Sequence, residues 1–236
     1  MSWLPENWDV LSIAAVVIAA LGGVVGITAG VQGFTATANA RRLVLWTSEA
    51  LDHTHEAGRV ATLKEMRSGA EARLLALHLV RWWRFTEAAG YLMFAGPFLF
   101  LTFGRATGWF SIISSVLFVA VMIQGSTRRA IRTYCERVRI EHEYVDGSRR
   151  VNRPQLGMLS LIEGGTPREW RLSGLAAIEV TAFVAGIALL ASGWSTVWGI
   201  VLASGGAGGF ALWFGEVHEY ARTLAAKSTR ALSAAQ

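Results

Sequence analysis

The chain contains four long segments without a single Asp, Glu, Lys or Arg. Together they make up 106 of the 236 residues, so all 39 charged residues fall in the other 130. Soluble domains carry about a quarter charged residues, whereas this chain has 17%, unevenly placed. This segregation excludes a soluble globule, a disordered chain and a disulfide scaffold. It predicts an all-α integral membrane protein. The charge-free segments are residues 10–40, 88–104, 106–127 and 180–215.

The lengths of these segments predict five transmembrane helices. A helix needs roughly 20 apolar residues to cross the hydrocarbon core of a bilayer. The last segment is long enough for two helices, which the Gly193-Trp194-Ser195 stretch separates. The predicted spans are Val10–Val31, Ala88–Gly104, Gly108–Gln124, Leu172–Gly193 and Ser195–Gly215.

The basic residues predict how these helices are oriented. Eight Lys and Arg residues lie in 41–87, ten in 128–171 and three in the tail 216–236, while Arg105 stands alone on the opposite side. Cytoplasmic loops retain Lys and Arg, so we expect the N-terminus outside and the C-terminus in the cytoplasm. The 20 Arg against 2 Lys are typical of a high-GC genome, so we expect a bacterial plasma membrane.

This topology divides the chain into alternating membrane and cytoplasmic parts. The outer N-terminus and first span are followed by an amphipathic helical segment, a two-span hairpin, a basic segment, a second hairpin and a tail. In that order, the predicted parts are 1–33, 34–87, 88–125, 126–171, 172–215 and 216–236.

The first cytoplasmic segment has the pattern of amphipathic helix. Apolar residues recur every three or four positions, and Gly58 is the expected break between a helix over 41–57 and another over 60–85. Two interpretations are open: the stripe packs within the protein or against a neighbour, which the interleaved acids favour, or it lies on anionic lipid. The stripe consists of Val60, Leu63, Met66, Ala70, Leu74, Leu77 and Val80.

The second cytoplasmic segment begins as a basic helix over 126–140. Asp146-Gly147 is a hairpin turn signal between two short runs, so a small β-hairpin at 143–151 is a further possibility. Its arginines are candidates for contacts with lipid phosphate or an acidic partner, and without a recognition motif nucleic acid is not expected. These basic candidates are Arg128, Arg129, Arg132, Arg149, Arg150 and Arg153.

Glycines at four-residue spacing form the most specific motif of the chain. Gly22, Gly26 and Gly30 lie along one narrow stripe of the first span, and Gly205 and Gly209 repeat the spacing in the fifth. Without side chains there, another helix backbone can approach closely. The stripes serve either the packing of spans one and five or a homo-oligomeric interface.

Two polar residues inside the predicted spans are candidates for function. Glu179 is the one acid within a span, and an intramembrane carboxylate points to ion passage, proton transfer or a buried ion pair. The alternative is a side chain that reaches back to the cytoplasmic headgroups near Arg171. Gln124 is a candidate for a hydrogen bond between helices.

The sequence lacks the patterns of enzymes and cofactor proteins. All five histidines lie outside the spans, and the single cysteine, Cys135, excludes an internal disulfide. Phosphate loops, dinucleotide fingerprints and serine elbows are missing. We therefore expect no enzyme activity, no catalytic residue, no cofactor and no metal site.

Three functions remain, in decreasing order of support. The first is a homo-oligomeric channel or translocation assembly, or a small subunit of a membrane complex, with membrane lipids and sister subunits as partners. The second is a regulatory or scaffold subunit that docks a cytoplasmic protein on the 41–85 stripe. The third is a lipid-headgroup enzyme using His142, Glu143 and His218 at the inner face.

Overall fold

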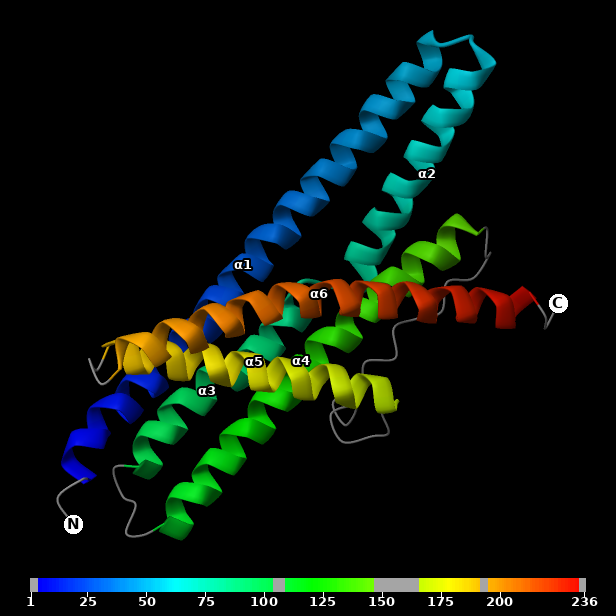
Figure 1. Ribbon diagram of the computed structural model, residues 1–236. Coiled ribbons are helices and arrows are strands. Elements are labelled where there is room, and N and C mark those ends of the chain that lie inside the picture. The colour runs from blue at the N-terminus through cyan, green and yellow to red at the C-terminus, as the bar shows by residue number, and fades with distance from the viewer. Residues whose placement is uncertain (1–3, 104–108, 147–165, 192–194, 234–236) are drawn as a thin grey trace. The chain divides into compact units, whose positions relative to one another are not determined.

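A computed structural model describes residues 4–103, 109–146, 166–191 and 195–233. All secondary structure in these ranges is α-helical, as expected (Figure 1). The helices are α1 (Leu4–His53), α2 (Ala57–Leu79), α3 (Trp83–Phe103), α4 (Trp109–Val145), α5 (Pro167–Ala191) and α6 (Thr196–Ser233).

The first predicted span and the helix expected over 41–57 are one continuous helix. α1 has 50 residues, and neither Gly nor Pro occurs between Gly33 and Gly58, so no residue in this stretch interrupts it. The break falls at residues 54–56, ahead of the predicted Gly58, which is the second residue of α2. Its sequence, Thr54-His55-Glu56, follows Asp52-His53, and Asp, His and Thr are weak helix formers.

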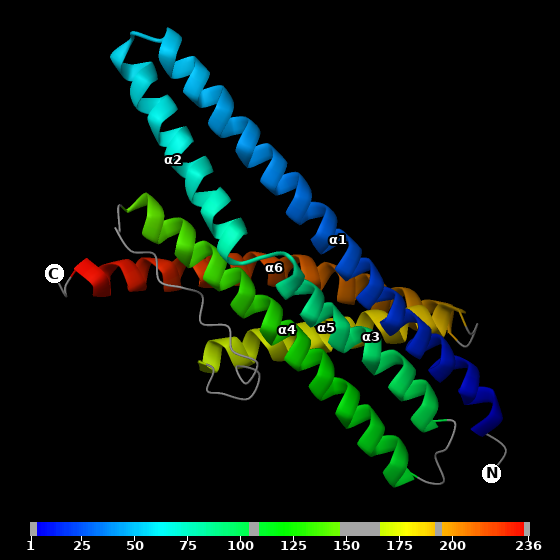
Figure 2. The same cartoon turned by 180° about the vertical axis from the view of Figure 1, so that it is seen from behind.

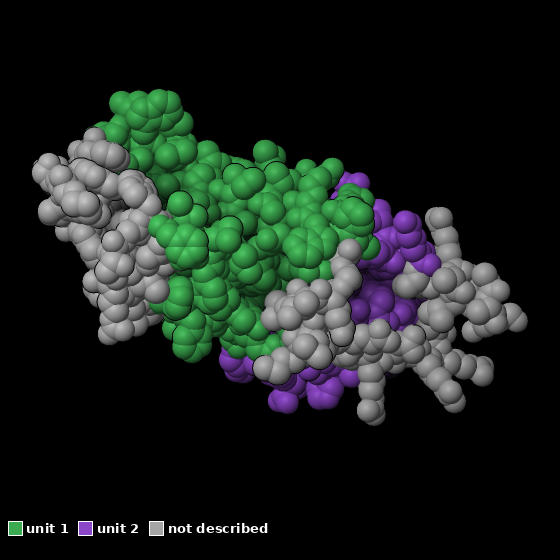
Figure 3. Space-filling view, turned by 90° about the horizontal axis from the view of Figure 1, so that it is seen from below, with its two compact units in different colours: residues 1–27, 85–131, 158–217 green, residues 28–84, 132–157, 218–236 purple. Residues whose placement is uncertain are grey.

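Two compact units divide the chain, and Figure 3 colours them separately. Unit 1 contains residues 1–27, 85–131 and 158–217, and unit 2 contains residues 28–84, 132–157 and 218–236. Because the boundaries fall inside helices, α1, α3, α4 and α6 each contribute to both units.

Unit 1 has a small apolar core to which four helices contribute. The core residues are Ile18 of α1, Ala95 of α3, Val119 and Ile123 of α4, and Val184 of α5. Polar groups join α3 and α4 nearby: the Ser126 hydroxyl donates to the Ala88 carbonyl over 2.6 Å. The same helices carry many large apolar side chains on their outer faces, such as Phe110 at 87% and Leu212 at 77% exposed.

Unit 2 is built around a hairpin of α2 and the second half of α1, which Figures 1 and 2 both show side by side. Most of the 60–80 stripe is turned inward: Leu63, Ala70 and Val80 are buried, although Met66 is 41% exposed. Val80 packs with Ala76 and with Ile140 of α4, and Val138 packs with Ala221 and Ala225 of α6. This burial agrees with the prediction that the stripe packs within the protein.

The prediction of a β-hairpin at 143–151 is wrong for its first strand. Glu143, Tyr144 and Val145 are the last three residues of α4. Glu143 is buried and forms an ion pair with Arg139 one turn earlier, an interaction that the helical spacing of four residues permits. The second run, Ser148–Val151, lies outside the described residues.

Two of the helices are long and apolar enough to cross a membrane. The stretches are Pro167–Ile187 of α5 and Thr196–Lys227 of α6, within the ranges that the structure describes. A core helix of a soluble protein would be mostly buried, but only 28% and 17% of their apolar windows are buried inside the chain. The low burial favours a lipid environment for this pair.

Candidate functional sites

The pairing of α5 with α6 depends on glycine. A Cβ on Gly186 would lie 2.3 Å from the Ala203 nitrogen, and a Cβ on Gly206 would lie 2.6 Å from the Glu179 carbonyl oxygen. Real Cβ atoms do not approach backbone so closely, so only glycine fits at these positions. On the α6 side Gly199, one of the small residues that repeat every four positions, faces Leu190. Near the start of α5, the Trp213 indole of α6 donates to the Leu172 carbonyl over 2.8 Å.

Glu179 projects from α5 into the gap that these glycines leave. A Cβ on Gly209 would lie 2.7 Å from its Oε1 atom, so the carboxylate occupies the space that a side chain on α6 would fill. The Oε2 atom is buried and has no hydrogen-bond partner among the described residues. The structure therefore packs Glu179 between two helices and does not pair it with Arg171. Arg171 instead faces Glu216, at 3.5 Å.

The glycines of the predicted stripes contact other helices than expected. Gly22 packs on α3, where its Cβ would lie 2.9 Å from the Met93 nitrogen. Gly30 packs on the ring of Trp82, and Gly209 packs on Glu179 of α5. Gly205 has nothing within 4 Å. Gly26 lies within α1, and its surroundings are outside the described side chains.

Two of the arginines predicted to bind lipid form contacts with other side chains inside unit 1. Arg128 is 2% exposed and stacks on the ring of Trp170, with 4.3 Å from its guanidinium carbon to the ring centre. Arg129 is 4% exposed and donates to Glu87 over 2.6 Å. Since both guanidinium groups are buried, neither belongs to an exposed basic surface.

The remaining candidates are Gln124 and the other four basic residues. Arg132 is half-buried on α4 in unit 2, and Gln124 is half-buried on the same helix in unit 1. Arg149, Arg150 and Arg153 lie outside the described residues.

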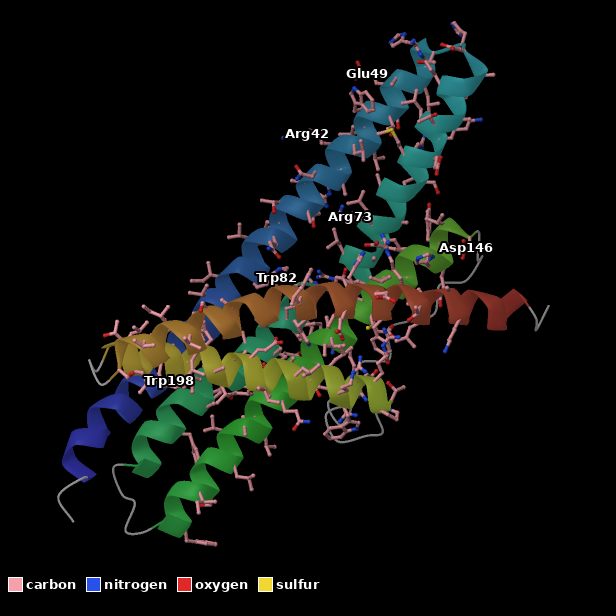
Figure 4. The ribbon with its side chains drawn as sticks, viewed as in Figure 1. Arg42, Glu49, Arg73, Trp82, Asp146 and Trp198 are labelled. Atoms are coloured by element: carbon pink, nitrogen blue, oxygen red, sulfur yellow. The ribbon has the colours of Figure 1, made fainter. Side chains whose placement is uncertain are left out.

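Unit 2 contains a cluster of charged groups on α2, α4 and α6. Arg137 donates from Nε and a terminal nitrogen to the Val80 carbonyl, over 3.1 and 2.8 Å, and so satisfies the C-terminal end of α2. Burial lowers the pKa of Arg137 to about 10, which still leaves it charged at neutral pH. Burial also raises the pKa of Glu141, against the opposing charges of Arg73 and Arg137. Figure 4 labels Arg73 on α2.

The fold brings the two histidine-bearing segments, on α4 and α6, together. The Tyr134 hydroxyl lies 2.5 Å from Nδ1 of His218, and both His142 and His218 act electrostatically on Glu141. Glu143 is already paired with Arg139. Across the residues that the structure describes, no group of three or more His, Cys, Asp or Glu residues is placed to hold a metal ion.

Sequence patterns gave no indication of two contacts that tie unit 2 together. The Tyr144 hydroxyl donates to Glu71 over 3.0 Å, and Arg137 crosses to Val80. Both pairs join positions more than 50 residues apart, so helical spacing carries no signal for them. Comparisons with protein families, with curated proteins and with solved structures returned no match to this chain.

Proposed function

We propose that the protein is a five-span membrane protein of the bacterial plasma membrane, with its N-terminus outside. The proposal is supported by the exposed apolar side chains of α3 and α4, in addition to those of α5 and α6. Phe94 is 76% exposed, Ile113 63% and Leu117 65%. Large exposed apolar side chains on charge-free helices are what a lipid environment requires.

The boundaries of the two units support the same topology. The breaks after residues 27, 84 and 217 fall within four residues of a predicted membrane boundary, and the break after residue 131 falls seven residues beyond Gln124. Most of unit 2 then corresponds to the predicted cytoplasmic segments. The main exceptions are residues 126–131 and 166–171, which belong to unit 1, and residues 28–33 of the first predicted part, which belong to unit 2. A chain that folds separately in lipid and in water would divide at these places.

Labelling with a membrane-impermeant maleimide tests the topology in intact cells. The background variant Cys135→Ser removes the single native thiol, and one new cysteine is added per variant. We expect Ser2→Cys to react from outside and Ser233→Cys to react only after permeabilisation. The reverse pattern, or reaction at both ends without permeabilisation, would contradict the proposed orientation.

Within this topology we propose that the protein conducts or translocates cations, as a homo-oligomer or as a small subunit of a complex. The observation that carries this proposal is the buried Oε2 atom of Glu179, which has no partner among the described residues. An ionised carboxylate within the bilayer is costly unless a proton or cation accompanies it. Glu179 is therefore the group we expect to exchange a proton or bind a passing cation.

Ion flux into liposomes that contain the purified protein tests this role. We expect Glu179→Gln, which keeps the shape and removes the charge, to reduce proton or potassium flux at least about tenfold. Glu216→Gln is the matched control, because Glu216 lies on the same helix pair but is 50% exposed. Equal flux through Glu179→Gln and the unchanged protein would refute the role of this carboxylate. A signal no greater than that of empty liposomes would refute conduction.

A face of α6 supports the assembly of several copies. Gly205, Gly208 and Gly215 have nothing within 4 Å, whereas Gly206 and Gly209 of the same helix are packed on α5. Small residues on an open face allow a second helix to approach closely. The mass of the complex extracted from its membrane tests this point, and a monomer without a partner would contradict it.

A further inference from the structure

Unit 2 contains a pocket of about 580 Å³ next to the bend between α2 and α3. Its walls come from three helices and from the bend itself, at Arg81 and Trp82. This volume is within the range of small-molecule sites, roughly 300–1,000 Å³. Figure 4 labels Trp82 at the bend.

The polar residues that line the pocket carry more positive than negative charge. Arg41 of α1, His78 of α2 and Arg81 all line it and are exposed. Within the described part of the chain, neither Arg41 nor Arg81 forms an ion pair. Two guanidinium groups at one pocket are suited to an oxyanion, since each presents several N–H donors in a planar fork.

The one acid on the lining does not offset this charge. Glu71 accepts from Arg67 over 2.8 Å and from the Tyr144 hydroxyl over 3.0 Å. The hydrogen bond from Arg67 lowers the pKa of Glu71, which keeps it ionised and engaged with its own partners. Arg41 and Arg81 are thus available to a ligand.

The rest of the pocket lining is largely apolar. Leu74, Leu75 and Leu77 of α2 line it together with Trp82. Glycine holds the indole against α1: a Cβ on Gly33 would lie 2.7 Å from the Cβ of Trp82, and Gly30 faces the ring. Phe34 adds a ring contact, with centroids 5.9 Å apart. A pocket with an oxyanion site and an apolar wall suits an amphiphile better than a free ion.

Chain connectivity places the pocket beside the predicted membrane boundary. Arg41 is the first residue after the charge-free segment 10–40 of α1, and Trp82 directly precedes α3. We propose that this pocket binds the phosphate headgroup of an anionic phospholipid, with Arg41 and Arg81 on the phosphate and the leucine wall against the glycerol and first methylenes. The identification of the ligand as a lipid, and not a soluble phosphate ester, rests on the proposed membrane location.

Lipid titration of the full-length protein in neutral detergent, followed by native mass spectrometry, tests the proposal. The probes are phosphatidylglycerol, phosphatidylcholine and glycerol phosphate. The test variant is Arg41→Gln with Arg81→Gln. The control variant is Arg42→Gln with Arg59→Gln, which removes the same charge from two exposed arginines of unit 2 that do not line the pocket. Figure 4 labels Arg42 on α1.

We expect phosphatidylglycerol to bind at least about tenfold more weakly to the test variant and less than threefold more weakly to the control variant. Equal losses in the two variants would overturn the pocket in favour of diffuse charge attraction. Binding of phosphatidylcholine as tight as that of phosphatidylglycerol would overturn the role of net negative charge. Glycerol phosphate binding as tightly as the lipid would overturn the lipid assignment and leave a soluble phosphate ester as the ligand.

Extraction of membranes with alkaline carbonate separates this inference from the proposed function. Release of the protein into the soluble fraction would overturn the membrane location, and the lipid source with it. Retention in the pellet, together with equal lipid binding by test and control variants, would overturn the pocket alone.

Discussion

The two units of this chain are both helical, but they are stabilised differently. Unit 1 brings α5 and α6 together through glycine and leaves most of the exposed large apolar side chains of the described residues on its surface. Unit 2 buries small residues such as Ala72 and Ala76 and joins its helices through side chains such as Arg137, Glu71 and Tyr144. The contrast teaches that helices of one chain can be joined either by close backbone contact at glycine or by hydrogen bonds from side chains. In lipid, close backbone contact replaces the hydrophobic driving force that water supplies.

The largest expected effect comes from adjacent glycines of α6. In Gly206→Leu the new side chain meets the backbone of Glu179 and Phe183, which cannot move aside, so we expect a loss of about 3 kcal/mol or more and little folded protein. Gly205→Leu points into open space and should leave the stability of the monomer within about 0.5 kcal/mol.

Size-exclusion chromatography and thermal unfolding in detergent measure both glycine variants. If Gly205→Leu yields folded monomer where the unchanged protein is oligomeric, the open face of α6 is the interface between copies. Equal folding of Gly205→Leu and Gly206→Leu would contradict the packing of α6 on α5.

The second largest effect is expected in unit 2, at Arg137. Arg137→Leu leaves the buried Val80 carbonyl without its two donors, and hydrogen bonds from a charged group contribute about 1.5–3 kcal/mol. We expect a loss of stability of this size, with faster amide hydrogen exchange at the C-terminal turn of α2. Arg59→Leu removes an exposed ion pair with Glu56 and should change stability by less than about 1 kcal/mol. Similar losses in the two variants would contradict the capping role of Arg137.

Two carboxylates of unit 2 should respond to pH in opposite directions. Burial raises the pKa of Glu141, so its ionised form destabilises the fold, and this penalty grows as the pH rises from 4.5 to the raised value. The hydrogen bond from Arg67 lowers the pKa of Glu71. The stability that Glu71 contributes is therefore present above 4.5 and lost as the pH falls through the lowered value.

Unfolding of two isosteric variants between pH 3 and 8 checks these signs. At neutral pH we expect Glu141→Gln to be more stable than the unchanged protein and Glu71→Gln to be less stable. Both differences should shrink as the pH falls, because the native carboxyl groups then become neutral as well. If both variants shift in the same direction at neutral pH, the different surroundings inferred for Glu71 and Glu141 are wrong.

The smallest effect is expected at the exposed ion pair of unit 1. Arg171 and Glu216 are 3.5 Å apart, and their side chains are 64% and 50% exposed. A solvent-screened pair of this kind contributes less than about 1 kcal/mol. Arg171→Gln should therefore unfold within a few degrees of the unchanged protein. A loss as large as that of Arg137→Leu would indicate that the pair lies in a less polar environment than its exposure implies.

Sequence patterns were most informative for features that depend on the residues of a single helix. The charge-free segments predicted helices, and every described residue of those segments except Ser195 lies in a helix. Helix boundaries were less predictable: α1 runs through its expected end, and Glu143 continues α4 where a strand was predicted. Local turn signals failed there because an ion pair one helical turn away, with Arg139, stabilises the helix instead.

Among the candidate sites, residue type identified Glu179 because an acid in an apolar segment stands out in the sequence. Only the structure shows what surrounds Glu179: Gly209, which lies 30 positions later in the sequence, faces its carboxylate. Arg128 and Arg129 show the opposite outcome: they were candidates for lipid contact, but Trp170 and Glu87 engage them inside unit 1.

By itself, the sequence determined the helical class and the segregation of charge, because both depend on the local pattern of residues along one helix. Only the tertiary structure decided which glycines pack and which stay open, which arginines are buried, and that Arg41, Arg81 and the leucines of α2 line one pocket. The physical reason is that packing partners lie on other helices, at sequence separations that no helical or strand period encodes.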